Sequence, residues 1–239
     1  MIYTIGNQRL QIPEADAKGK NRTPQQSVPW RDVAESCRTL DAICRQVPLP
    51  VTKVTDGIAK VGFWAGVFRN IWPDCELVLN ETSQPANQVL QNNFPDDKTR
   101  IYHYTLHEWI PSDCDVGLVD GDHFTLRLLP EWETTLKNFS ATCKYMIVAD
   151  GACYGFKFGN LKHYGAATPE EYYYLLDEAL YDITKKHITH ISKFENAACI
   201  LLSSEKPNTI RWLNPSNLIV SRGAQTFKVQ SSHKQGKLL

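Results

Sequence analysis

The chain has 239 residues, which suits one large domain with a sizeable core. Its hydrophobic share of 42% and charged share of 22% are ordinary for a globular protein, and no apolar run approaches the length of a membrane span. The 26 basic and 26 acidic residues balance to a net charge of zero, but six cations and no acid lie from Lys206 onward. The composition therefore excludes a membrane-spanning protein and leaves a weakly basic tail.

The cysteines indicate a reducing compartment. There are seven of them, an odd number with no CxxC spacing. Cys114, Cys143 and Cys199 lie beside or inside apolar runs, where a thiol behaves as a small hydrophobe. This argues against disulfides and against a zinc site. The first residues carry no basic segment followed by an apolar core, as a signal peptide would. We expect a cytoplasmic protein.

We divide the chain into three parts. Residues 1–27 form an N-terminal arm or lid that is polar from about residue 17, residues 28–204 form the main domain, and residues 205–239 form a basic C-terminal extension. Trp212 and Leu213 in the extension are expected to dock on the domain. A basic tail either binds nucleic acid as an arm or is only a solvated end.

Strands and helices alternate through the main domain. The expected strands are 51–57, 76–81, 99–106, 115–119, 145–150, 187–194 and 197–202, and the expected helices are 29–46, 58–71, 85–93, 126–138 and 169–182. The last two strands are joined by Glu195-Asn196 as a hairpin, so the final strand should run antiparallel. A further short strand is expected at 2–5, or a hairpin through Gly6-Asn7. The pattern predicts a Rossmann-like α/β fold: a seven-stranded, mostly parallel sheet with helices on both faces.

Polar residues cluster where the strand 115–119 ends. Asp120, Asp122 and His123 follow an apolar run that is typical of a strand buried on both faces. Ligands bind at the carboxyl ends of such strands in open α/β sheets, so these side chains are placed for chemistry. The alternative is that an aspartate here only caps the next helix.

Two earlier strand ends also carry acids. Asp56 and Gly57 follow the first strand, and the motif Asp56-Gly57 extends through Gly62, so backbone there could approach a ligand. Gly57 could equally serve only to turn the chain. Glu81 ends the second strand, where an acid can accept hydrogen bonds from ribose hydroxyls. The alternative is an acid that faces water.

Asp150 ends the strand that should neighbour the one ending at Asp120. Carboxylates from adjacent strand ends can share a hard cation such as Mg²⁺, which suggests Asp120 and Asp150 as ligands. Alternatively, one carboxylate takes a proton from a substrate hydroxyl, as Asp122 or His123 could. The choice between these readings stays open on the residues alone.

The segment after Asp150 is rich in glycine, aromatic residues and cations. Aromatic rings with cations suit a flat or anionic substrate, and the glycines would permit lid motion. The alternative is a loop packed on the sheet edge. The candidate substrate-binding residues are Tyr154, Lys157, Lys162 and His163.

These motifs resemble those of a known family. The expected strand order and the acids after strands two and four look like a class I S-adenosylmethionine-dependent methyltransferase. Within that class, Leu118-Val-Asp-Gly-Asp-His-Phe124 is similar to the Asp-Gly-Asp-His segment of small-molecule O-methyltransferases related to macrocin O-methyltransferase. The resemblance spans about residues 51 to 204.

The resemblance implies roles for individual residues. Asp56, Gly57, Gly62, Glu81 and Asp120 would bind S-adenosylmethionine. In cation-dependent members the first Asp of the segment binds metal and the second acts as base, which implies Asp120 and Asp122 here. The chain departs from the family at Gly151, which stands where a second acid would follow Asp150, and in the first loop, which lacks its middle glycines.

We therefore expect an S-adenosylmethionine-dependent methyltransferase that acts on a hydroxyl of a small or medium-sized acceptor. The alternative is a catalytically degenerate protein of the same fold that binds a nucleotide, a nucleic acid or a protein. A third reading is a nucleic-acid methyltransferase with basic arms, whose affinity for RNA or DNA would fall steeply with salt.

Overall fold

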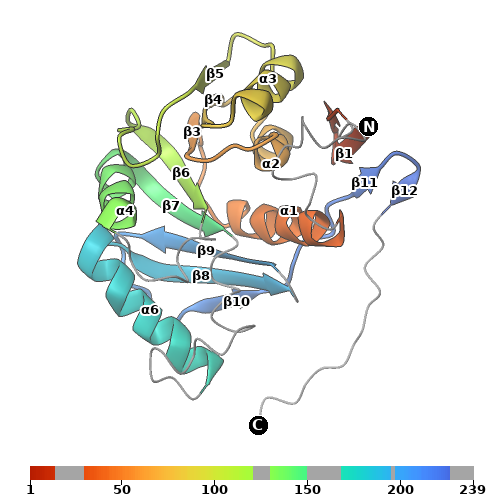
Figure 1. The fold of residues 1–239 in the computed structure, drawn as a ribbon. Coiled ribbons are helices and arrows are strands. Elements are labelled where there is room, and N and C mark those ends of the chain that lie inside the picture. Colours follow the sequence, from red (N-terminus) through yellow and green to blue (C-terminus); the bar gives the residue numbers. More distant parts are fainter. Residues whose placement is uncertain (14–29, 121–129, 150–167, 195–196, 227–239) are drawn as a thin grey trace.

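The computed structural model describes residues 1–13, 30–120, 130–149, 168–194 and 197–226 (Figure 1). The helices in these ranges are α1 Trp30–Cys44, α2 Phe63–Ile71, α3 Gln84–Asn93, α4 Pro130–Thr142 and α6 Pro169–Thr184. The strands are β1 Ile2–Ile5, β2 Gln8–Gln11, β3 Lys53–Asp56, β4 Glu76–Asn80, β5 Thr99–Tyr102, β6 Cys114–Asp120, β7 Cys143–Ala149, β8 His187–Phe194, β9 Ala197–Ser203, β10 Arg211–Leu213, β11 Val220–Arg222 and β12 Gln225–Thr226. None of these helices combines the length and the hydropathy that a bilayer crossing requires.

The centre of the molecule is a twisted sheet of mostly parallel strands. Its order is β10-β8-β9-β7-β6-β3-β4-β5, with β9 running antiparallel to both β7 and β8 (Figure 1). The Rossmann-like α/β prediction is confirmed at this level, and so is the antiparallel direction of the strand at 197. The turn residues Glu195 and Asn196 lie outside the described residues.

The described part of this sheet has eight strands, one more than the seven expected. β10 pairs in parallel with β8, with Trp212 opposite Ile191 and Leu213 opposite Ser192. The sequence does not reveal this strand because it has only three residues, fewer than a periodic signal needs. The C-terminal segment thus contributes an edge strand, and its Trp212 and Leu213 dock as expected.

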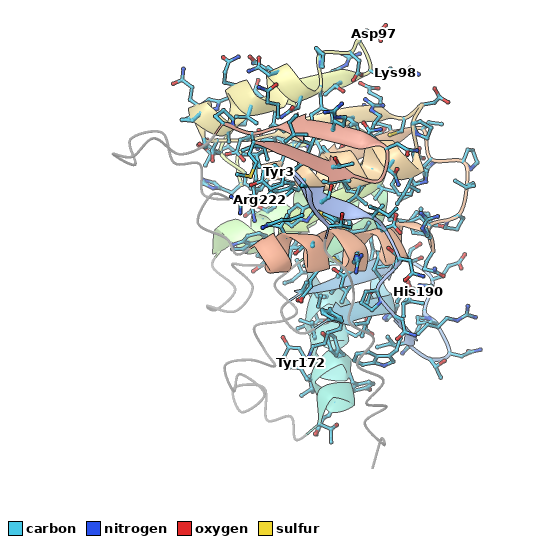
Figure 2. The ribbon with its side chains drawn as sticks, turned by 90° about the vertical axis from the view of Figure 1, so that its right-hand side faces the viewer. Tyr3, Asp97, Lys98, Tyr172, His190 and Arg222 are labelled. Carbon is cyan, nitrogen blue, oxygen red and sulfur yellow. The ribbon has the colours of Figure 1, made fainter. Side chains whose placement is uncertain are left out.

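A second, four-stranded sheet joins segments from opposite ends of the sequence. Its order is β12-β11-β1-β2, and β1 pairs antiparallel with β11 so that Tyr3 lies opposite Arg222. The Arg222 guanidinium lies 5.9 Å from the centre of the Tyr3 ring, and the two residues are neighbours in Figure 2. Of the two alternatives for the start of the chain, a short strand or a hairpin, the structure has the hairpin, with Gly6 at a φ of 57° in its turn.

Two apolar cores lie on opposite faces of the central sheet. One contains side chains of α1, α2 and α3 together with β1 and β11, and the other contains side chains of α4 and α6. Figure 1 shows the same division, with α4 and α6 apart from α1, α2 and α3. Strands covered on both faces bury alternate residues in different cores: Val116 and Leu118 of β6 belong to the first and Val119 to the second.

Local signals place most of the helix ends. Thr168 caps α6, accepting a hydrogen bond of 3.2 Å from the Glu171 backbone N–H, and Pro169 follows at the first helical position, as the sequence predicts. The predicted helix at 58–71 begins late, at Phe63. The backbone is left-handed at Lys60 and at Gly62, so the expected first turn of this helix, from residue 58 to residue 62, is not helical.

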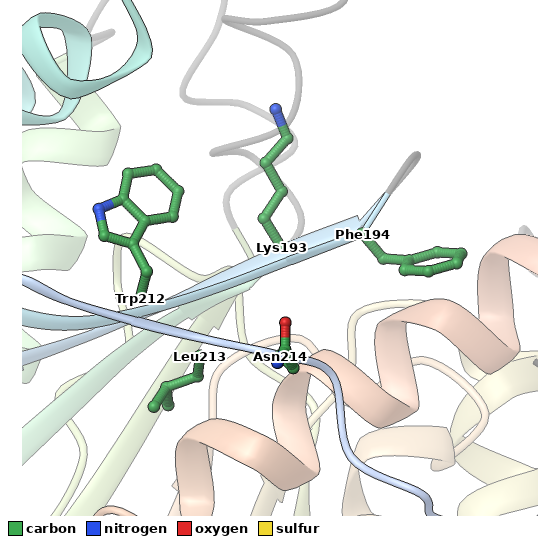
Figure 3. Close-up of a pocket in the computed structure, with 5 residues that line it drawn as sticks. All are labelled: Lys193, Phe194, Trp212, Leu213 and Asn214. Atoms are coloured by element: carbon green, nitrogen blue, oxygen red, sulfur yellow. The ribbon is translucent and has the colours of Figure 1, made fainter. Parts of the chain in front are cut away.

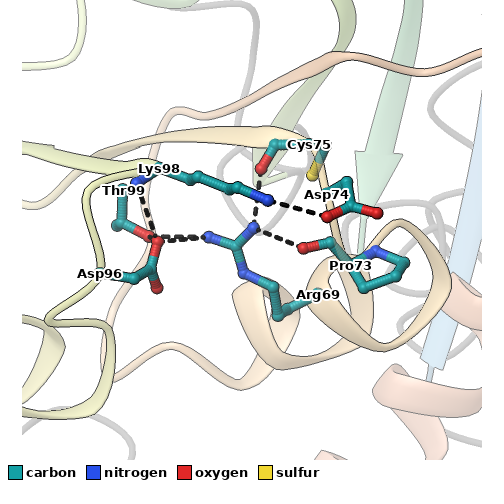
Figure 4. Close-up of polar contacts among 7 residues, drawn as sticks. All are labelled: Arg69, Pro73, Asp74, Cys75, Asp96, Lys98 and Thr99. Carbon is teal, nitrogen blue, oxygen red and sulfur yellow. Dashed lines mark hydrogen bonds and ion pairs between the residues drawn. The ribbon is translucent and has the colours of Figure 1, made fainter.

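The amino-terminal edge of the sheet is held by polar clusters. The buried Arg69 guanidinium of α2 donates to the carbonyl oxygens of Pro73 and Cys75, to the Asp96 carboxylate and to the Thr99 hydroxyl (Figure 4). These bonds join the end of α2 to the starts of β4 and β5. Because Arg69 is only 8% exposed, its charge depends on these acceptors.

A second cluster surrounds Asp115 near the start of β6. One carboxylate oxygen accepts from the Thr52 and Lys53 backbone N–H groups at 2.7 and 3.1 Å and from the Thr52 hydroxyl at 2.7 Å. The other accepts from Lys144 at 2.6 Å. Burial alone would raise the pKa of the Asp115 carboxyl, but the bonds from Lys144, Thr52 and Lys53 outweigh it and lower the pKa to about 2. Asp115 thus joins the starts of β3, β6 and β7.

Replacing Asp115 with alanine is expected to lower the free energy of unfolding by about 2–3 kcal/mol at neutral pH, because buried N–H groups lose their acceptor. The matched control is Lys144→Met, which removes only the ion pair of a lysine that is 73% exposed and should cost less than about 1 kcal/mol. The pKa of Asp115 is depressed, so its contribution exists above its ordinary pKa and disappears as the pH falls from about 4 towards 2. Urea unfolding of the three proteins across this range measures both effects, and equal losses in the two variants would contradict the assignment.

The six described cysteines, which include Cys114, Cys143 and Cys199, are all buried thiols. Cys114 and Cys143 are opposite one another on β6 and β7. This agrees with the prediction that these residues behave as small hydrophobes. The remaining cysteine, Cys153, lies outside the described residues.

Candidate functional site

Four neighbouring parallel strands end together at the carboxyl edge of the sheet. In the register, Asp56 lies opposite Leu79 of β4 and Leu118 of β6, and Asn80 lies opposite Tyr102 of β5. Glu81 lies two residues after Leu79, and Asp120 lies two residues after Leu118. Asp56, Glu81 and the backbone of Asp120 therefore converge at one edge, as the sequence predicts.

Asp56 braces the loop between β3 and α2. Its carboxylate is completely buried and accepts a 3.1 Å hydrogen bond from the Ile58 backbone N–H. The next N–H, that of Gly57, donates to the Leu118 carbonyl oxygen at 2.9 Å. The loop is thereby tied to the end of β6 as well as to β3. Because the Asp56 side chain is not at the surface, its bond to Ile58 serves the shape of this loop.

Glu81 holds the same loop from the other side. Its carboxylate oxygens accept backbone N–H groups of Lys60 at 2.7 Å and Ser83 at 2.6 Å, and the side chain is buried. The alternative of an acid facing water is therefore wrong. Burial raises the pKa of the Glu81 carboxyl, while the Ser83 and Lys60 N–H groups act in the opposite direction. Each oxygen accepts one of these bonds and has a second lone pair for a ligand hydroxyl.

Asn80 is a site residue that the sequence analysis missed. It is completely buried at the end of β4, and its amide donates to the carbonyl oxygens of Gly57 at 3.2 Å and Tyr104 at 3.0 Å. Its amide oxygen accepts the Tyr104 N–H at 2.9 Å. Asn80 therefore fixes the loop after β3 and the loop after β5 to one another. An amide that ends the apolar run Leu77-Val-Leu79 was the only signal for this role.

The two glycines of the first loop are required for different reasons. A Cβ on Gly57 would lie 2.9 Å from side-chain atoms of Leu106 and Phe139, so close packing requires glycine there. Gly62 has a φ of 93°, and a Cβ there would lie 2.6 Å from the ring of Phe94. Gly57 is therefore constrained by its packed neighbours, whereas Gly62 turns the chain into α2.

Aromatic rings extend the edge beyond β5. The rings of Tyr102 and Tyr104 stack with centroids 5.9 Å apart, and Tyr104 is 52% exposed. Trp109 lies 6.2 Å from Tyr102 and packs edge-on against Phe139 of α4. A flat ligand ring could stack on such a surface next to Glu81.

Other predicted site residues lie outside the described residues. These are Asp122, His123, Asp150, Tyr154, Lys157, Lys162 and His163. Asp120 ends β6 opposite Ala149, which places the backbone before residue 150 beside it. The described residues contain no cluster of three or more His, Cys, Asp or Glu side chains that could hold a metal ion. The proposed Mg²⁺ ligands Asp120 and Asp150 therefore stay a prediction.

No protein-family model and no curated protein sequence matches this chain. Solved structures do match. The mitomycin 7-O-methyltransferase MmcR aligns with a TM-score of 0.54 and 14% identity over 79% of this chain and 58% of its own. The N,N-8-amino-8-demethyl-D-riboflavin dimethyltransferase RosA from Streptomyces davawensis aligns with a TM-score of 0.50 and 12% identity over 65% of this chain and 50% of its own.

The O-methyltransferase NcsB1 from neocarzinostatin biosynthesis, solved with S-adenosylmethionine and 2-hydroxy-5-methyl naphthoic acid, aligns with a TM-score of 0.50 and 11% identity. That alignment covers 65% of this chain and 49% of NcsB1. The chain thus spans between about half and three fifths of the length of these three proteins. At such low identities the matches establish the fold: this chain has the α/β fold of these methyltransferases.

Proposed function

We propose that this protein is an S-adenosylmethionine-dependent methyltransferase that methylates a hydroxyl of a small or medium-sized acceptor. One observation carries the proposal. The buried carboxylates of Asp56 and Glu81, from adjacent strand ends, hold a single loop at the carboxyl edge of a sheet with a methyltransferase fold. The proposal also draws on the likeness of Leu118–Phe124 to the Asp-Gly-Asp-His segment.

The chemistry of the edge suits this cofactor. S-adenosylmethionine carries a positively charged sulfonium and ammonium group, which the acids at this edge would attract. The Glu81 oxygens can each accept one more hydrogen bond, and the two hydroxyls of a ribose are matching donors. The loop of residues 56–62 would flank the methionine part, and Asp120 would lie beside it. When bound, the cofactor supplies an electrophilic methyl group.

We assign the acceptor chemistry to residues near the ends of β6 and β7. Asp122, or His123, would remove the proton of the acceptor hydroxyl, so that the oxygen can attack. Tyr154, Lys157, Lys162 and His163 would bind and orient the acceptor. Most of the rate gain would come from holding the two reactants in line.

Isothermal titration with S-adenosylmethionine and with S-adenosylhomocysteine tests the proposal. We expect dissociation constants of about 1–100 μM for the wild type. Glu81→Gln should weaken binding by about 10- to 100-fold, because the amide is a poorer acceptor for the hydroxyls. Since burial raises the Glu81 pKa, the wild-type affinity should fall with decreasing pH sooner than the ordinary pKa of a glutamate would predict.

The matched control is Glu76→Gln, at the opposite end of the same strand, where the carboxylate pairs with Arg100 at 2.8 Å. This variant should bind the cofactor as the wild type does. No binding at millimolar cofactor, or equal affinities of the two variants, would defeat the proposal. Thermal unfolding of each variant separates a binding defect from a folding defect.

A second candidate function is a binding module that has lost catalysis. It is favoured by the first loop, where Ala59 and Val61 are buried at positions that glycine would occupy in an open cofactor loop. This reading predicts that Asp122→Asn leaves the biological activity intact. If Asp122→Asn lost the activity while its fold was preserved, the methyltransferase proposal would be favoured over the binding module.

A further inference from the structure

The hairpin of β1 and β2 packs against α2, the helix that directly follows the cofactor loop of residues 56–62. Gly62 ends this loop and Phe63 begins α2, so the position of the helix fixes one end of the loop. Figure 1 shows α2 between the central sheet and β1. The hairpin and the cofactor loop, which lie far apart in the sequence up to residue 62, thus meet at one short helix.

Two apolar contacts join the hairpin to the first half of α2. Tyr3 of β1 packs edge-on against Phe63, with ring centroids 5.1 Å apart and an interplanar angle of 72°. One turn further, a Cβ on Gly66 would lie 3.2 Å from the Ile5 side chain, so glycine lets the hairpin reach the helix backbone. The ring of Tyr3 is therefore the hairpin contact nearest to the loop.

The hairpin is itself held in place at two points. Its turn is tied to the end of α2, because the Asn70 side-chain oxygen accepts the Asn7 backbone N–H at 3.0 Å. On its other side β1 pairs with β11, and the Arg222 guanidinium lies over the Tyr3 ring. Tyr3 thus belongs to a fixed support and is not a ring on a loose end.

Backbone hydrogen bonds connect the start of α2 to the rest of the loop. The Gly66 N–H donates to the Gly62 carbonyl oxygen at 2.8 Å, and the Gly62 N–H donates to that of Ala59 at 2.9 Å. The next residue, Lys60, donates its N–H to the Glu81 carboxylate at 2.7 Å. A displacement of the start of α2 therefore reaches the backbone that Glu81 holds.

We propose that the N-terminal hairpin positions the cofactor loop, and that Tyr3 is the positioning residue, acting through Phe63. The inference rests on the proposed function, because it takes this loop to bind S-adenosylmethionine. Without the Tyr3 ring, Phe63 loses a packing partner, and the loop populates open conformations that bind the cofactor poorly. Coupling of this kind is reciprocal, so a bound cofactor in turn stabilises the hairpin.

Amide hydrogen exchange of the protein without ligand tests the coupling first. Tyr3→Ala should raise the exchange rates of the Ala59 and Lys60 amides about 2- to 10-fold, the factor that corresponds to an aromatic pair. Tyr3→Phe, which keeps the ring, should exchange as the wild type does. Calorimetry should then show that Tyr3→Ala binds S-adenosylhomocysteine more weakly by the same factor, and this ligand should slow exchange of the β1 amides in the wild type.

The matched control is Trp212→Ala, at the other end of the central sheet. Trp212 packs edge-on against Tyr173 with ring centroids 5.2 Å apart, almost the separation of Tyr3 and Phe63. Its strand β10 lies five strand spacings, roughly 24 Å, from β3. Figure 3 shows Trp212 at a cavity of about 500 Å³ that it lines with Lys193, Phe194, Leu213 and Asn214. Losing this ring removes a comparable contact, so loop exchange and ligand affinity should stay those of the wild type.

The inference is overturned if Tyr3→Ala leaves loop exchange unchanged, or if Trp212→Ala raises it by the same factor, because Tyr3 would then contribute only to general stability. If the wild type does not bind S-adenosylhomocysteine, the proposed function fails, whereas exchange without ligand still decides the coupling. Tyr3→Leu, which is apolar but has no ring, serves if the alanine variant fails to fold, and it should change loop exchange in the same direction.

Discussion

Replacing Asn80 with alanine is expected to lower the free energy of unfolding by about 2–4 kcal/mol. The variant loses three hydrogen bonds and leaves the Gly57 and Tyr104 carbonyl oxygens and the Tyr104 N–H without this partner. Because Asn80 is completely buried, water does not readily replace the amide. Urea unfolding followed by circular dichroism measures the loss.

The same substitution should also weaken the proposed cofactor binding. Asn80 fixes the carbonyl of Gly57, and Ala59 donates its N–H to the Asn80 carbonyl at 2.9 Å, so this strand end sets the position of the loop. The matched control is Asn92→Ala on the exposed face of α3, which should change stability by less than about 0.5 kcal/mol. Comparable stabilities of the two variants would show that Asn80 does not hold the edge together.

Gly62→Ala is expected to destabilise the protein by about 3 kcal/mol, which combines left-handed strain with overpacking. At a φ of 93° an alanine is strained, and its Cβ would lie 2.6 Å from Phe94 and 3.0 Å from Leu90. Both neighbours are buried, so neither can move away without disturbing the core around α3. Thermal and urea unfolding report the effect.

Gly223→Ala separates the two causes. Gly223 also has a positive φ, 56°, but no atom lies within 4 Å of a Cβ built on it. This variant should cost only about 1 kcal/mol, the strain alone, reduced by the lower entropy of its unfolded chain. If both glycine variants lost the same stability, the contact with Phe94 would not matter.

The sequence was informative where local chemistry decides the structure. The alternation of expected strands and helices predicted the Rossmann-like α/β fold, and the Thr168-Pro-Glu-Glu171 start of α6 was predicted to the residue. Pairing between distant segments was not predictable in this way. β10 has three residues, and β11 pairs with β1 across more than two hundred residues, so no local pattern marks either pairing.

The candidate site was predictable to a similar degree. Asp56 and Glu81 were recognised as acids at strand ends, which a strand register brings to one edge. Asn80 was missed because its role depends on carbonyls of two other loops, which no spacing in the sequence reveals. The loop itself was predicted as helix from residue 58, because the left-handed turn at Lys60 has no glycine to mark it.

The pairing of β1 with β11 has a consequence for the order in which the chain folds during synthesis. Ile5 is synthesised more than two hundred residues before its strand partner Val220. Until then one side of the first hairpin presents unpaired backbone groups, to which a neighbouring nascent chain could add. Translation that stops before Val220 would leave this edge permanently open, so products that lack β11 should aggregate more readily than those that contain it.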